Sequence, residues 1–269
     1  MIRSLFVVDG DALIPSELTR GGWSDEAQHG SPPAGIMARA IERVPTAGPM
    51  QVVRFTIDLF REVPLAPLRI ETEVIRDGRR IQVVEARLFH DDRELGRATA
   101  LKIRVAEQGG DELRGTRGED PLPTERHPED LPLLDLRSFF GGDETLLRFH
   151  TDAIEIRSSE DSFVRPVVGE SWFRLKVDLV EGETVTPFQR AAIMSDLSNG
   201  NSQALDPKRW LYVNPDTTLY LHRLPDGEWV GMRSWVDQVS TGIGVNESAV
   251  YDLKGRFGHI NQAQLIERR

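Results

Sequence analysis

The feature that most constrains the fold of this chain is an internal repeat. Residues 54–101 align with residues 216–263 without a gap when one stretch is shifted along the other. The identities share one offset, and the apolar positions between them keep the same phase. They are Thr56/Thr218, Leu59/Leu221, Arg61/Arg223, Val74/Val236, Ile81/Ile243, Val83/Val245, Glu85/Glu247 and Gly96/Gly258. Two tandem copies of one structural unit are therefore predicted.

Each copy is predicted to begin with a helix. The first helix is expected over 33–44, with Ser31 as its N-cap and prolines in its first turn, and its apolar residues recur at the helical period. The second helix is expected to start at Pro187, capped by Thr186.

Antiparallel strands are predicted after each helix. Apolar residues alternate with polar ones from Val53 to Leu59, which is typical of a half-buried strand, and turn residues stand at Asp77-Gly78 and Asp91-Asp92. Strands are expected near 53–59, 68–74, 81–89, 101–105, 219–221, 229–236, 244–251 and 260–266, with further strand material at 4–8 and 172–177. A helix followed by a meander of strands indicates the α+β class.

Composition excludes several function classes. The 269 residues contain 33 Lys and Arg against 43 Asp and Glu, and a net charge of −10 argues against a general nucleic-acid binder. The absence of cysteine excludes disulfides, thiolate zinc sites, iron–sulfur clusters and cysteine nucleophiles, and it fits a cytoplasmic protein. No apolar run is long enough for a membrane span, and the N-terminus is a poor signal peptide.

Motifs for covalent or metal catalysis are missing. The segment Gly200-Asn201-Ser202-Gln203-Ala204 resembles a nucleophile elbow but follows a helix, whereas an elbow follows a strand. The six histidines show no metal-ligand spacing, so no metal and no cofactor are predicted.

One acidic residue has an unusual place. Asp196 falls in the last turn of the second helix, where the helix dipole disfavours a carboxylate, and on the same face as Ala192 and Ile193. Burial there is expected to raise its pKa, which would suit a general base. The alternative is an Asp that caps the following turn. Asn214 and Gln262 taken alone are more typical of turn and strand positions.

A basic cluster surrounds the Asp77-Gly78 turn. Arg76, Arg79 and Arg80 form either a solvated turn or a local phosphate-binding patch on an otherwise acidic chain.

The sequence resembles the acyl-CoA thioesterase II (TesB-like) family over nearly its whole length. The matching segments are Trp23, His29-Gly30, the helix to Val44, 53–67, 76–80, 169–172, the helix ending Met194-Ser195-Asp196, 214–223, 227–229 and the closing strand. The resemblance implies a double hotdog, with an N-terminal repeat at 1–106, a linker at 107–145 and a C-terminal repeat at 146–269. It also implies hydrolysis of fatty acyl-CoA and assembly into a homodimer or higher homo-oligomer.

The resemblance also implies the site. The family's catalytic Asp corresponds to Asp196, and its Gln corresponds to Gln262, with Gln264 as the alternative register. Asn214 stands where the family has Thr, and an Asn side chain can still hydrogen-bond a water. Asp196 would take the proton from a water that Asn214 and Gln262 hold. His29 and Gly30 are assigned to substrate binding near the oxyanion, and Arg79 and Arg80 to the CoA phosphates.

Two other functions stay open. A hotdog hydratase or dehydratase would pair an Asp with a His a few residues further on, and the segment after Asp196 contains no His. A non-catalytic acyl-CoA or acyl-carrier binder would keep the fold without turnover, and the Asn at the family's Thr position keeps this possibility open.

Overall fold

The computed structural model describes residues 2–109, 122, 126–137, 143–159, 168–203 and 205–269. Its helices are α1 (Ser31–Glu42), α2 (Pro187–Ser195) and α3 (Ser198–Asn201). Its strands are β1 (Ser4–Asp9), β2 (Ala12–Pro15), β3 (Met50–Leu59), β4 (Arg69–Asp77), β5 (Ile81–His90), β6 (Arg93–Arg104), β7 (Ile154–Ser158), β8 (Gly169–Leu175), β9 (Asp178–Val180), β10 (Trp210–Val213), β11 (Asp216–Leu221), β12 (Val230–Val239), β13 (Ile243–Asp252) and β14 (Gly255–Arg268). Most of the predicted linker, and the segment 160–167, lie outside the described residues.

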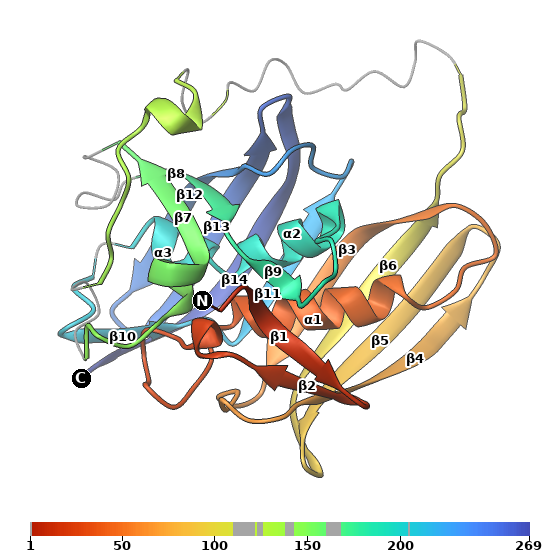
Figure 1. Cartoon of the computed structure of the whole chain (residues 1–269). Coiled ribbons are helices and arrows are strands. Elements are labelled where there is room, and N and C mark those ends of the chain that lie inside the picture. The colour runs from red at the N-terminus through yellow and green to blue at the C-terminus, as the bar shows by residue number, and fades with distance from the viewer. Residues whose placement is uncertain (1, 110–121, 123–125, 138–142, 160–167, 204) are drawn as a thin grey trace.

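One long antiparallel sheet joins the two halves of the chain (Figure 1). Its strand order is β4-β5-β6-β3-β11-β14-β13-β12-β8-β7, and β10 pairs with β14. The halves meet where β3 pairs with β11, and Thr56 lies directly opposite Thr218 there. Their hydroxyl groups are 3.2 Å apart. The pairing of β3 with β11 thereby satisfies the backbone hydrogen-bonding groups that each half would otherwise expose at a sheet edge.

Strands of the two halves correspond at the offset of the predicted repeat. Shifted by the 162 residues that separate Thr56 from Thr218, the bounds of β5 coincide with those of β13. The same shift brings the start of β6 onto the start of β14. The turns predicted at Asp77-Gly78 and Asp91-Asp92 join β4 to β5 and β5 to β6.

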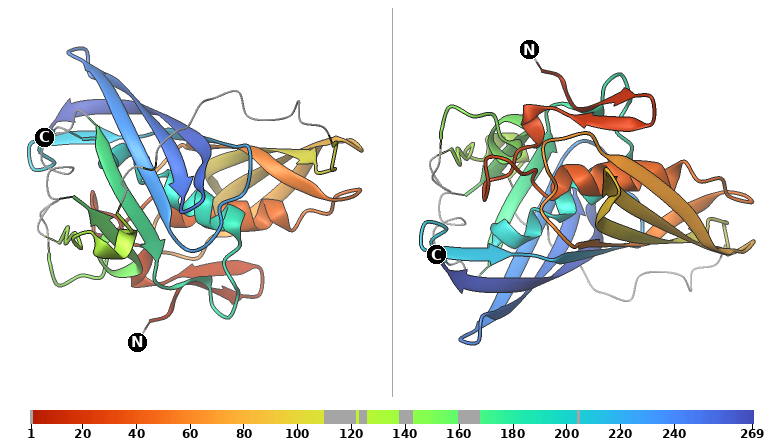
Figure 2. Two further views of the ribbon diagram at one scale, coloured as in Figure 1. Left: turned by 90° about the horizontal axis from the view of Figure 1, so that it is seen from above. Right: turned by 90° about the horizontal axis from the view of Figure 1, so that it is seen from below.

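Both long helices lie on one side of the long sheet. Figure 2 shows α1 and α2 between this sheet and the smaller sheet β2-β1-β9. Gly35 permits the close crossing of the two helices, because a Cβ there would lie 2.6 Å from Cγ1 of Ile193. The small sheet also ties the halves together, since β1 pairs in parallel with β9. No helix in the described part of the chain is long and apolar enough to cross a membrane.

The helix starts were predicted with mixed success. Thr186 caps α2 as expected, with a reciprocal bond pair to Gln189. The cap predicted for α1 is wrong, because Gly30 is the N-cap and Ser31 is already helical, with no side-chain bond to the cap. The reason is tertiary: a carboxylate from the other half, that of Asp196, lies against this helix start.

Candidate active site

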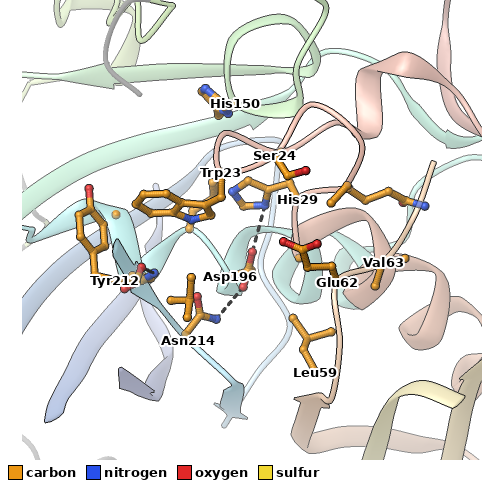
Figure 3. A pocket seen from close by; sticks show the side chains of 18 of the residues that line it. Trp23, Ser24, His29, Leu59, Glu62, Val63, His150, Asp196, Tyr212 and Asn214 are labelled. Atoms are coloured by element: carbon orange, nitrogen blue, oxygen red, sulfur yellow. Dashed lines mark hydrogen bonds and ion pairs between the residues drawn. The ribbon is translucent and has the colours of Figure 1, made fainter. Parts of the chain in front are cut away.

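A cavity of about 460 Å³ lies between the two halves (Figure 3). The first half contributes the loop around Trp23 and His29 and the segment after β3, and the second half contributes the end of α2, α3 and β10. Most of its wall is apolar. The apolar side chains are Trp23, Ala27, Leu59, Phe60, Val63, Leu136, Ile156, Phe173, Leu197, Leu211, Tyr212, Val213 and Pro215. Such a wall suits an apolar ligand with a few fixed polar contacts.

Asp196 supplies the carboxylate of this cavity. It is the C-cap of α2, and only 8% of the residue is exposed. Its Oδ2 lies 3.0 Å from Nδ1 of His29, and its Oδ1 accepts a 2.8 Å hydrogen bond from the side-chain amide of Asn214. Three residues that the sequence predicted for the site, from both halves of the chain, therefore meet here.

The start of α1 faces the same carboxylate. A Cβ on Gly30 would lie 2.7 Å from Oδ2 of Asp196, so only glycine allows this approach. The next residues, Pro32 and Pro33, carry no N–H, and the Ser31 N–H is hydrogen-bonded to the carboxylate. The positive end of α1 thus faces an anion from the other half.

These contacts reverse one expectation from the sequence. Burial acts to raise the pKa of Asp196, but the hydrogen bond and charge of His29, the Asn214 amide and the Ser31 N–H outweigh it. The net pKa is lower than that of an ordinary Asp, so the predicted raised pKa is wrong. The sequence shows that Asp196 ends α2, where the helix dipole disfavours its negative charge. It does not show that the start of α1, with its positive dipole end, lies against the carboxylate and compensates for this.

Gln262 does not line the cavity, because Thr217 lies between it and the lining residue Asn214. It is 1% exposed, and its amide donates to the hydroxyl of Thr217 at 2.7 Å. Thr217 lies within 3.3 Å of the Asn214 amide, so Gln262 reaches Asp196 through two intervening side chains. The alternative, Gln264, instead donates to Asn199 at 2.6 Å.

Arg79 and Arg80 lie away from the cavity. Both are exposed between β4 and β5, where the backbone of Arg80 accepts from Arg104. That end of the sheet holds the start of β3, whereas Leu59 at the other end lines the cavity. The length of β3 separates the two places by roughly 30 Å. A phosphate-binding role for this pair stays a prediction.

Sequence reasoning missed several cavity residues. Arg61 is an exposed arginine of the lining, and in the repeat it matches Arg223. His150 lies on a single π-helical turn, with its ring 6.4 Å from that of His29. Burial chiefly, with the charges of His29 and Arg148, lowers the pKa of His150 to about 3, so its ring is neutral. Arg61 was recognisable in the sequence as a repeated residue, whereas nothing local indicated His150.

The described residues contain no group of His, Asp and Glu side chains that could hold a metal ion.

Comparison with known structures gives the fold. A protein with a hotdog fold from Alicyclobacillus acidocaldarius matches with a TM-score of 0.71 at 16% identity, covering 97% of this chain and 95% of its own. An acyl-CoA thioesterase II from Mycobacterium marinum matches at 0.69 and 16%, with the same coverage. The dehydratase domain of PpsC from Mycobacterium tuberculosis matches at 0.53 and 16%, covering 98% of each chain.

Family models give the relationship. The acyl-CoA thioesterase N-terminal domain matches residues 19–103, and the acyl-CoA thioesterase C-terminal domain matches residues 122–266. Among curated proteins, none matches this sequence. The two models together cover most of the chain, and the cavity lies between the segments that they match. This protein is a thioester hydrolase, and it belongs to the acyl-CoA thioesterase family.

Proposed function

We propose that this protein is a double-hotdog enzyme that hydrolyses fatty acyl-CoA to a fatty acid and CoA, using water activated at Asp196. Its two repeats would be residues 1–106 and 146–269. The observation that carries the proposal is the carboxylate of Asp196, held by both halves of the chain at the wall of a largely apolar cavity. Direct attack by water agrees with the lack of a cysteine or serine-elbow nucleophile in the sequence.

The amide of Asn214 would fix the attacking water beside Asp196. Asn214 lines the cavity and is bonded directly to the carboxylate, so a water on the cavity side of this pair would be held by both side chains. Gln262 would act less directly than the family pattern implies, because Thr217 stands between it and Asn214. Its contribution would be to hold Thr217 and thereby the position of Asn214.

The N–H of Gly30 is the best candidate for an oxyanion donor. It belongs to the N-cap of α1, and no hydrogen bond from this N–H is formed within the described part of the chain. The two prolines that follow cannot donate, and Ser31 is engaged with Asp196. A donor at a helix start, in a site with little water, stabilises a tetrahedral oxyanion effectively.

Replacement of Asp196 by Asn tests the proposal. We expect thiol release from medium- and long-chain acyl-CoA by the parent protein, and a loss of kcat on the order of 10²–10⁴ in Asp196→Asn, because the charge that drives proton removal is gone. Asp9→Asn, at an exposed strand end, serves as the matched control. Equal kcat in Asp196→Asn and the parent, with both folded, would refute the role of Asp196.

A hydratase or dehydratase activity is the second candidate. The sequence argued against it because no His follows Asp196, yet the structure supplies His29 from the other half at 3.0 Å. Membership of the thioesterase family favours hydrolysis over this reaction. Incubation with 2-enoyl-CoA separates the two: loss of the enoyl absorbance without free thiol indicates hydration, and free thiol indicates hydrolysis. Tight binding of acyl-CoA with neither product would indicate a binding protein.

Assembly into a homo-oligomer and a cytoplasmic location remain predictions.

A further inference from the structure

We propose that His29 is the acid–base catalyst of this hydrolysis and that Asp196 holds its ring. The inference rests on the proposed function and refines one step of it: the water gives its proton to His29, and Asp196 drives this transfer through the His29 ring rather than by taking the proton itself. His29 directly precedes the cap of α1, and Asp196 ends α2, so the pair forms only when the two halves pack together. Nδ1 of His29 and Oδ2 of Asp196 are 3.0 Å apart.

The surroundings of His29 decide which ring nitrogen carries the proton. Two contacts compete for Nδ1: the Ser31 N–H points at it from 3.1 Å as a hydrogen-bond donor, and Oδ2 of Asp196 lies 3.0 Å away as an acceptor. An unprotonated Nδ1 would turn its lone pair toward an ionised carboxylate, so the proton belongs on Nδ1 and is donated to Asp196. With the proton on Nδ1, the Ser31 N–H gives up its bond to this nitrogen and donates to the Asp196 carboxylate, which it also reaches. Nε2 is left with its lone pair available.

Nε2 of His29 is accessible from the cavity. Figure 3 shows the ring next to Asp196 among the side chains that line the cavity, and 20% of the His29 side chain is exposed. In the described residues, no side chain or backbone group is hydrogen-bonded to this nitrogen. The other titratable groups around it are His150, which is neutral, and Glu62 at the cavity wall. Arg148 lies behind His150 and is bound to Asp25.

In the proposed reaction the proton moves from the water to Nε2 of His29 and then to the leaving sulfur. As the water oxygen attacks the thioester carbon, one water proton moves to Nε2 and the electron pair of the C=O bond moves to the carbonyl oxygen. When that oxygen re-forms the double bond, the C–S bond breaks, and the proton on Nε2 moves to the departing sulfur. The products are the carboxylic acid and the CoA thiol, and Asp196 stays ionised throughout, stabilising the charged ring.

Substitution of His29 by Asn tests this role, because the Asn side chain has a donor in place of Nδ1 and no atom in place of Nε2. Its side-chain amide takes the place of Nδ1 and can donate to Asp196, but nothing takes the place of Nε2. We expect His29→Asn and His29→Ala both to lose kcat on the order of 10²–10⁴, with a much smaller change in KM. Added imidazole is expected to restore part of the activity of His29→Ala. His90→Asn, at the turn between β5 and β6, is the control.

Each outcome decides between the two roles. If His29→Asn keeps the parent kcat while His29→Ala loses it, then His29 only positions Asp196 and the proposal is wrong. If both variants keep the parent kcat, the proposal is likewise wrong, while the proposed function stands. If the parent releases no thiol from any acyl-CoA, both the function and this role of His29 are refuted.

Discussion

The glycine at position 30 is required by what lies against it rather than by its own backbone. Its φ of −67° is open to any residue, but a Cβ would lie within 2.8 Å of both carboxylate oxygens of Asp196. The Asp196 carboxylate can therefore occupy its place only because residue 30 has no side chain. The same contact explains why α1 begins at Ser31 without a side-chain cap, since the Ser31 N–H is bonded to Asp196.

Gly30→Ala is therefore expected to displace the Asp196 carboxylate. A displacement of about 1 Å at a reacting group costs on the order of 10²-fold in rate, so kcat should fall by that factor. Gly48→Ala is the matched control, because a Cβ at Gly48 meets nothing within 4 Å and its φ is not positive. Kinetics of the two variants at equal thermal stability will check this, and a normal kcat in Gly30→Ala would contradict it.

At the scale of elements, the two copies use one repeated arginine differently. Arg223 follows β11, and its guanidinium binds the carboxylate of Asp252 at the end of β13, with one contact of 2.7 Å. In the first copy the position equivalent to Asp252 is His90, and no carboxylate of the described residues forms an ion pair with Arg61. Arg61 instead lines the cavity. A structural arginine in one repeat is thus available for binding in the other.

Asp252→Asn tests the structural half of that comparison. Burial acts to raise the pKa of Asp252, but Arg223 and the N–H groups of Asp226 and Lys254 hold it below the ordinary value. A lowered pKa means that the ionised group stabilises the fold above about pH 3.8 and that this contribution is lost as the pH falls through the native pKa. Removing the charge should cost about 2 kcal/mol at pH 7. Urea unfolding should show the difference from the parent shrinking toward pH 3, and a pH-independent difference would contradict this assignment.

At the scale of the whole molecule, the protein is acidic and its proposed substrate, acyl-CoA, is a polyanion. With a net charge of −10, the chain repels CoA phosphates unless cations lie near the cavity mouth. Arg61, exposed on the cavity lining, would be the arginine that receives the phosphates of this proposed substrate. The sequence instead pointed to Arg79 and Arg80, at the far end of the same sheet.

Arg61→Ala is expected to raise KM for acyl-CoA about tenfold, the equivalent of one charge-assisted hydrogen bond. KM for an acyl-N-acetylcysteamine thioester, which has no phosphate, should not change. The double variant Arg79→Ala/Arg80→Ala provides the comparison. A rise in KM for acyl-CoA in that variant, with none in Arg61→Ala, would transfer the phosphate site to the turn between β4 and β5.

The sequence by itself indicated both longer helices and most of the long strands, but not the short strands β2, β7, β9 and β10. Alternating apolar residues and turn residues fix strands locally, and two copies with one phase lead to sheets of matching register, as in β5 and β13. It also indicated Asp196, because a carboxylate at a helix end on an apolar face is recognisable from spacing alone.

Only the tertiary structure decided what surrounds that carboxylate. His29 and Asn214 come from segments far apart in the chain, and the start of α1 and the end of α2 meet because the two helices pack antiparallel across one sheet. The direction of the pKa shift of Asp196 is the sum of these contacts, so spacing along the sequence cannot give it. Local patterns specify which faces are apolar, whereas electrostatics depends on distances that exist only after the two halves have joined.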